Sequence, residues 1–201
     1  MKITFLGHAT LEIQINEFNL LVDPFISGNP MASEINLDDL KPDFILISHA
    51  HQDHTLDVEK LAKDNNSLII SNFEIVSHFQ SKGLNGHPMN HGGKWNFDFG
   101  ELKYVNAIHT STFPDGSNGG QPGGFIITSN NKSIYIAGDT ALTYDMKLIP
   151  INYNLDLAIL PIGDNFTMGY KDAIIASDFI ECNKILGLSL IHISEPTRQS
   201  K

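Results

Sequence analysis

Short apolar runs separated by turn residues recur along most of the chain, and they constrain the fold more than any other feature. Many runs alternate apolar with polar residues or are rich in branched aliphatic side chains, which is typical of β-strands. The sequence predicts strands at Lys2–Leu6, Leu11–Ile15, Leu20–Val22, Phe44–Ile47, Leu68–Ile70, Trp95–Phe99, Leu102–Ala107, Phe125–Thr128, Ser133–Ala137 and Leu157–Leu160, with another beginning at Lys184–Leu186. The 16 glycines also favour tight turns over a helical bundle.

Fewer segments have the spacing of helices. Apolar residues recur at helical intervals in Leu56–Ala62, Phe73–Gln80 and Tyr170–Ile180, and Gly83 is a suitable residue just past the second helix. Strands come first and then alternate with helices, which indicates sheets covered by helices. The chain has 201 residues and no repeat or linker, so the sequence predicts one domain.

Four candidate metal ligands follow a predicted strand directly, in the run HAHQDH at residues 49–54. A strand end that opens into a loop lets side chains converge on one point. His49 and His51 are two apart in an extended segment and can point the same way, while Asp53 and His54 need only a turn to serve an adjacent position. The alternative is a solvated loop that is rich in histidine, but such a density of potential ligands directly after an apolar strand has little structural purpose. Imidazole and carboxylate suit zinc, and manganese and iron also accept them.

Two later residues complete this pattern. His109 follows the strand predicted at Leu102–Ala107, and Asp139 follows the one at Ser133–Ala137. Alone, each would be an ordinary polar residue at a strand end. Because both share the placement of the first cluster, the sequence predicts that they join it.

The sequence resembles the metallo-β-lactamase superfamily, whose signature H-x-H-x-D-H is the run at 49–54. It is most similar to the small bacterial metal-dependent hydrolases of the ascorbate-phosphate lactonase-like branch. The resemblance extends from Met1 to about Gly187. It is carried, in the family's order, by Gly7-His8-Ala9-Thr10, Val22-Asp23-Pro24, the run at 49–54, Ile108-His109-Thr110-Ser111, Gly120–Gly124, Ala137-Gly138-Asp139-Thr140 and Pro161-Ile162-Gly163-Asp164.

The resemblance implies a four-layer αββα sandwich with two divalent metal ions at one edge, zinc being the first expectation. It implies that the first metal is held by His49, His51 and His109, the second by Asp53 and His54, with Asp139 bridging the pair. A water between the metals would ionise near neutral pH and attack a polarised carbonyl or phosphoryl centre. Asp53 would position that hydroxide or shuttle its proton.

For two further residues the sequence leaves two possible roles each. His8 is expected either to donate to the substrate or a developing oxyanion, or to be a satisfied core histidine. Asp23 is expected either to orient the cluster loop and fix histidine tautomers, or to begin a turn before Pro24.

Three other features lie around the predicted site. The glycine-rich segment Gly119–Gly124 permits close backbone approach near the site, or is a plain turn before the next strand. Asp164–Gly169 is a candidate second rim loop. Cys182 lies away from the motifs, so we interpret it as structural, and no serine or cysteine nucleophile is required.

Composition and charge indicate which classes of partner and which cellular location to expect. The formal charge is −10, from 13 basic and 23 acidic residues, which opposes attraction to nucleic acid. The first residues lack a signal peptide's pattern, and no apolar run has the length of a membrane span. With one cysteine no internal disulfide forms, so a reducing cytoplasm is the expected location. The expected partner is a small-molecule substrate, and the oligomeric state is left open.

The C-terminal residues do not fit the rest of the chain. Residues 188–198 read LSLIHISEPTR, which resembles the translation of a widely used sequencing adapter. We therefore expect a domain at 1–187 whose last strand and helix are incomplete, followed by a non-native tail at 188–201. Ser189 stands about where the resemblance implies a last histidine ligand, and His192, within the tail, is not counted as one.

The predicted function is a metal-dependent hydrolase that acts on a small ester, lactone or phosphoester. The alternatives are a metal-binding or redox module on the same scaffold, or a truncated fragment without activity. A nuclease of the same superfamily is disfavoured, because the chain lacks a basic stripe.

Overall fold

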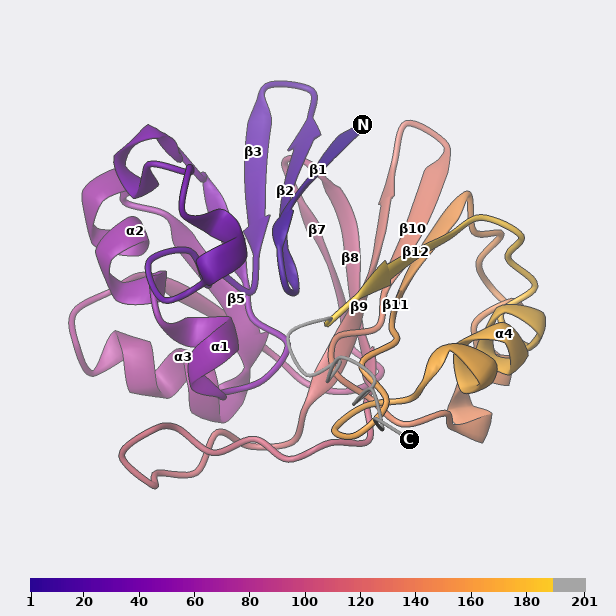
Figure 1. The fold of residues 1–201 in the computed structure, drawn as a ribbon. Helices are drawn as coiled ribbons and strands as arrows, with labels where there is room; N and C mark the ends of the chain where they lie inside the picture. The colour runs from indigo at the N-terminus through magenta and orange to yellow at the C-terminus, as the bar shows by residue number, and fades with distance from the viewer. Residues whose placement is uncertain (190–201) are drawn as a thin grey trace, which may run out of the picture.

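Two six-stranded sheets face each other and form the centre of the molecule (Figure 1). The structure is a computed structural model, and it describes residues 1–189. Helices cover the outer face of each sheet, which gives the αββα sandwich that the sequence predicted. No helix within residues 1–189 combines the length and apolarity needed to cross a membrane.

The first sheet has the order β1-β2-β3-β4-β5-β6. Its strands are β1 (Lys2–Gly7), β2 (Thr10–Ile15), β3 (Phe18–Val22), β4 (Phe44–Leu46), β5 (Leu68–Asn72) and β6 (Gly86–Met89). The first three pair antiparallel through short turns, and β3 to β6 run parallel. The three-residue β4 is fully buried, and it ends two residues before the histidine cluster.

The second sheet has the order β12-β11-β10-β9-β8-β7 and the same plan. Its strands are β7 (Lys94–Phe97), β8 (Gly100–Asn106), β9 (Gly123–Ser129), β10 (Lys132–Ile136), β11 (Leu157–Pro161) and β12 (Ile185–Leu188). The first four pair antiparallel, and β10 to β12 run parallel. Strands β8 and β10 therefore run in the same direction as β11 and β12, so their carboxyl ends lie at the same edge of the sheet.

The helices are divided between the two outer faces (Figure 1). The helices α1 (Gln52–Thr55), α2 (Val58–Asn65) and α3 (Phe73–Gln80) cover the first sheet, and α4 (Tyr170–Phe179) covers the second. Short 3-10 helices lie at η1 (Pro30–Ala32), η2 (Leu37–Asp39) and η3 (Tyr144–Leu148). The Asn72 side chain caps α3 by accepting a hydrogen bond from the Ile75 amide at 2.9 Å.

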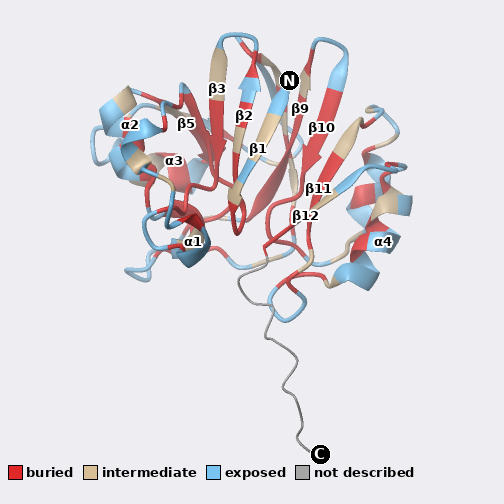
Figure 2. Cartoon of the chain, turned by 45° about the horizontal axis from the view of Figure 1, so that its top comes forward, coloured by how far each residue is buried: buried red, intermediate tan, exposed pale blue. Residues whose placement is uncertain are grey.

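The main core lies between the sheets, where buried strands face one another (Figure 2). It includes Leu11, Ile13, Leu46, Phe125 and Ile136, all at most 1% exposed. A second apolar cluster lies under α2 and α3, and a third lies under α4 and η3. Cys182 belongs to the third cluster, where it is buried, which agrees with its predicted structural role.

Most predicted elements are present, and the differences have local causes. The strand β6 was not predicted, because its residues Gly-His-Pro-Met lack an apolar alternation. It pairs only with β5 at the sheet edge, where a proline is tolerated. The helix predicted from Leu56 begins at Val58, because α1 forms its own short turn just before it.

Candidate metal centre

The predicted ligands come from three loops that converge between the sheets. The cluster follows β4 and continues into α1, where Asp53 and His54 lie. His109 follows β8, and Asp139 follows β10. All six predicted ligands belong to groups of donor atoms that lie within 4.8 Å of one another. The structure thus brings together side chains that are up to 90 residues apart in the sequence, counting from His49 to Asp139.

The first group consists of His49, His51 and His109. His49 Nε2 lies 3.0 Å from His51 Nδ1. The His109 ring centroid lies 4.9 Å from that of His49 and 5.0 Å from that of His51. Three imidazoles arranged in this way match the ligand set of a zinc site that keeps one open position.

The second region lies around His54, which is fully buried. His54 Nε2 lies 3.5 Å from Asp139 Oδ2, and both residues form a donor group with His49. Among the described residues, neither ring nitrogen of His54 has a well-aligned hydrogen-bond partner. A buried imidazole that faces a carboxylate without a good hydrogen bond fits a bound cation, so this region also suits a metal ion.

Asp23 orients the histidines of both regions. Its carboxylate accepts hydrogen bonds from the Ser48 amide and the Ser48 hydroxyl, both at 2.7 Å, and lies 3.0 Å from His54 Nδ1. Because the Ser48 hydroxyl donates to Asp23, it accepts from His49 Nδ1 at 2.9 Å. His49 therefore carries its proton on Nδ1 and directs Nε2 at the other donor atoms, while the Asp23 carboxylate lies beside Nδ1 of His54. The orienting role predicted for Asp23 agrees with this geometry.

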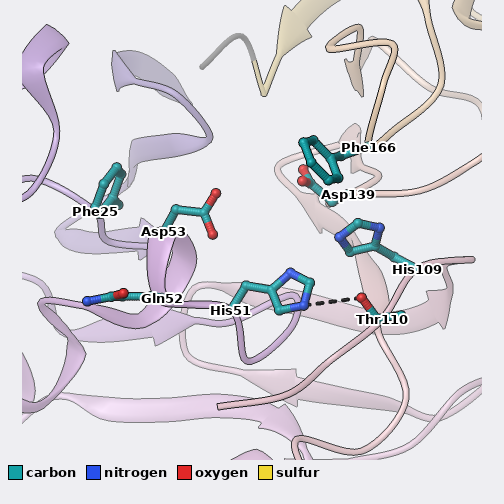
Figure 3. Close-up of a pocket in the computed structure, with 8 residues that line it drawn as sticks. All are labelled: Phe25, His51, Gln52, Asp53, His109, Thr110, Asp139 and Phe166. Carbon is teal, nitrogen blue, oxygen red and sulfur yellow. Dashed lines mark hydrogen bonds between the residues drawn. The ribbon is translucent and has the colours of Figure 1, made fainter. Parts of the chain in front are cut away.

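Thr110 has the corresponding role for His51. Its hydroxyl lies 3.2 Å from His51 Nε2, as the dashed line in Figure 3 shows. This contact holds the ring with Nδ1 towards His49. Neither Ser48 nor Thr110 was predicted as a site residue, because their contacts with Asp23, His49 and His51 are visible only in three dimensions.

The buried charges are balanced within the site. Burial lowers the pKa of His49 well below its ordinary value, and the nearby His54 lowers it further. For His54, burial opposes protonation, but the carboxylates of Asp139 and Asp23 outweigh it and raise the pKa well above the ordinary value. For Asp139, burial opposes ionisation, but the His54 imidazolium outweighs it and lowers the pKa. Without metal, a proton on His54 supplies the positive charge that a cation would supply.

The metal-free protein is expected to be less stable at pH 5 than at pH 7. Burial lowers the pKa of His49, His51 and His109, so folding favours the neutral form of each ring. Unfolding lets each take a proton below a pH of about 6.5, and stability is lost as pH falls from there. His54 has a raised pKa and acts in the opposite sense, because its contribution to stability is complete below that pH. We expect the three rings with lowered pKa to outweigh this single group. Urea unfolding of the metal-free protein at both pH values measures the difference.

A matched variant makes this prediction specific. Replacing His49 with asparagine removes the most deeply buried of the three rings, so the difference in stability between pH 7 and pH 5 should shrink. Equal or greater stability of the unmodified protein at pH 5 would contradict the charge assignment.

His8 lies next to Asp53 in the buried part of the site. Its ring is fully buried, with Nε2 at 3.1 Å from Asp53 Oδ2, and it packs edge-on against Phe25 and His54. The cavity beside the cluster is lined by Asp53 but not by His8. His8 contacts Asp53, which lines the cavity, so direct donation from His8 to the substrate stays a prediction.

The cavity has a volume of about 590 Å³ and opens over the cluster. In Figure 3, His51 and Asp53 lie on one side, with His109 and Asp139 facing them. The remaining lining residues are Phe25, Gln52, Thr110 and Phe166. Phe166 belongs to the predicted rim loop Asp164–Gly169, which a bridge between Gly163 and Gly169 closes at its base.

The glycine-rich segment supports the cluster from behind and does not line this cavity. The Asn72 amide donates to the carbonyls of Gly119 and Gln121 at 2.7 and 3.0 Å. A Cβ atom at Gly119 would lie 2.2 Å from the Ala50 side chain, in the middle of the cluster loop. Of the two roles left open for this segment, the structural one fits.

Ser189 closes the described part of the chain beside the site. It is fully buried, and its hydroxyl donates to Asp139 Oδ2 at 3.0 Å. Leu188 completes β12 and is also buried. His192 and the rest of the tail predicted at 188–201 lie outside the described residues, so the proposed domain boundary stays a prediction.

The fold and the cluster together define an αββα protein with a metal-binding site between its sheets. Residues 2–186 match the family described as "Beta-lactamase superfamily domain". A UPF0173 metal-dependent hydrolase from Flavobacterium johnsoniae is 66% identical over 187 residues, which are 93% of this chain and 83% of that protein. One from Christiangramia forsetii is 64% identical over 188 residues, with the same two coverages.

A solved structure agrees with these matches. Igni18, a metallo hydrolase from the archaeon Ignicoccus hospitalis, has a TM-score of 0.82 to this chain at 28% identity, covering 93% of this chain and 81% of its own. The chain therefore belongs to the metallo-β-lactamase superfamily and is a metal-dependent hydrolase.

Proposed function

We propose that the protein hydrolyses a small ester, lactone or phosphoester with two divalent cations bound in the cluster. Zinc is the first candidate, and manganese and iron suit the same donors. The observation that carries the proposal is that donor groups from both regions border one cavity. His51 and His109 of the three-histidine group line its wall, as do Asp53 and Asp139.

The cations would supply a water that ionises near neutral pH and a positive centre that polarises the scissile group. The chain's own residues do the rest. Asp53 has a half-buried carboxylate at the cavity wall, held by His8 at 3.1 Å, so it is placed to hold or move a proton of the attacking water. Asp23 fixes the tautomer of His49 through the Ser48 hydroxyl, and Thr110 holds the His51 ring in place.

The cavity wall favours an uncharged substrate among the three classes. None of the described residues that line it is lysine or arginine, and Phe25 and Phe166 supply apolar rings. A phosphoester's negative charge would be balanced by the cations alone. We therefore place esters and lactones before phosphoesters.

A metal-reconstitution screen tests this proposal. The protein is stripped with a chelator, reloaded with zinc, manganese or iron, and assayed with a nitrophenyl ester, a lactone and a nitrophenyl phosphodiester. Hydrolysis should appear only after reloading. It should be lost in His109→Asn and kept in His91→Asn, whose ring lies outside the donor groups and contacts the Pro122 carbonyl. Absence of hydrolysis with every metal and substrate, or activity that survives chelation, would overturn the proposal.

A further inference from the structure

We propose that His8 is itself a ligand of the second cation, together with Asp53 and His54. This inference rests on the proposed function, because it assigns a residue to one of the two cations. The three side chains form a donor group in which all ligand atoms lie within 4.8 Å of one another. Besides a last histidine, where Ser189 stands in this chain, the resemblance implied Asp53, His54 and the bridging Asp139 at this position, so His8 would supply an additional imidazole.

The distances match coordination of one ion. Nitrogen and oxygen ligands bind zinc at about 2.0–2.2 Å, so two ligands of the same ion lie roughly 3–3.5 Å apart. His8 Nε2 lies 3.1 Å from Asp53 Oδ2. The rings of His8 and His54 have centroids 5.1 Å apart at an interplanar angle of 69°. Two imidazoles and one carboxylate are also the ligand set of a well-known type of catalytic zinc site.

The backbone is shaped to aim this ring. His8 has a φ of +54° and follows Gly7 at +107°, both in the left-handed region. The register between β1 and β2 shifts between Phe5 and Gly7, which redirects the next side chain. The Ser189 amide donates to the His8 carbonyl at 3.0 Å. Strained backbone of this kind is concentrated at functional sites.

The competing role is a hydrogen bond alone. In that case His8 Nε2 keeps its proton and donates to Asp53, and no metal contacts the ring. In our assignment Nε2 has lost its proton and faces the ion, while Asp53 binds the same ion beside it. The two roles differ in whether Nε2 carries hydrogen in the metal-loaded protein.

Cobalt titration of His8→Asn tests the assignment, with His91→Asn as the matched control. Asparagine tolerates a positive φ but is too short to reach the ion. The unmodified protein and the control should bind two Co²⁺ per chain. In His8→Asn the second Co²⁺ should bind at least about tenfold more weakly, and the proton NMR spectrum should lose the strongly shifted signals of one imidazole. Unchanged affinity for both ions with all these signals kept would overturn the assignment.

A second measurement needs no variant and so holds even if His8→Asn fails to fold. Nitrogen NMR of the zinc-loaded, unmodified protein should show His8 Nε2 without a bonded proton. A protonated Nε2 would overturn the assignment while leaving the proposed function standing. Failure of the unmodified protein to bind any metal would instead overturn both.

Discussion

Replacing Asp139 with alanine is expected to lower the rate of hydrolysis at least about a hundredfold and to reduce the bound metal. Its carboxylate lies 3.5 Å from His54 Nε2 and forms a donor group with His49, so it is placed to contact both cations. Loss of a residue that only hydrogen-bonds to a metal ligand typically lowers metal affinity or activity about 10–100-fold. Loss of a residue that contacts the ions should lower them further. Steady-state kinetics and elemental analysis of the purified variant measure both effects.

The control for this prediction is Asp172→Asn. Asp172 is an exposed aspartate in the first turn of α4, outside the donor groups, so its variant should behave as the unmodified protein does. If Asp139→Ala retained activity and metal content within a factor of two, Asp139 could not be a ligand of either cation.

Replacing Asp23 with alanine should lower the free energy of unfolding by about 3–5 kcal/mol. The change removes a carboxylate that is 1% exposed, leaves the Ser48 amide and the Ser48 hydroxyl without their acceptor, and takes away the negative charge 3.0 Å from His54 Nδ1. Removal of one partner from a buried ionic network typically has a cost of this size. Urea unfolding of the metal-free proteins measures it.

Asp23→Asn separates stability from metal binding. Asparagine keeps the shape and can still accept from Ser48, but its amide group would meet the proton on His54 Nδ1. We therefore expect this variant to be destabilised less than Asp23→Ala and yet to bind metal about 10–100-fold more weakly. Metal affinity equal to that of the unmodified protein would show that Asp23 does not fix the histidine tautomers.

Much of the fold could be predicted, because strands such as Leu11–Ile15 and Phe44–Ile47 bury apolar side chains in regular patterns. The strand β6 could not, since its pairing with β5 depends on backbone hydrogen bonds, which leave no side-chain pattern in the sequence. The separate helix α1 also escaped prediction. Its four residues are all polar, so no apolar spacing in the sequence marks them as helical.

The candidate ligands were predictable because the chemistry of a metal site restricts residue type strongly, and each ligand follows a strand. The supporting contacts were less accessible. Ser48 links its neighbour His49 to Asp23, which lies 25 residues earlier in the sequence, and no spacing rule marks this contact. His8 shows a further limit, since its motif indicated function but only the structure shows its ring in contact with Asp53 and His54.

An anomalous-scattering map from crystals grown with zinc tests most directly whether these side chains hold cations. We expect one peak at about 2.0–2.1 Å from nitrogen atoms of His49, His51 and His109, and a second beside His54, Asp53 and Asp139. A map with zinc bound elsewhere and no peak within this cluster would contradict it.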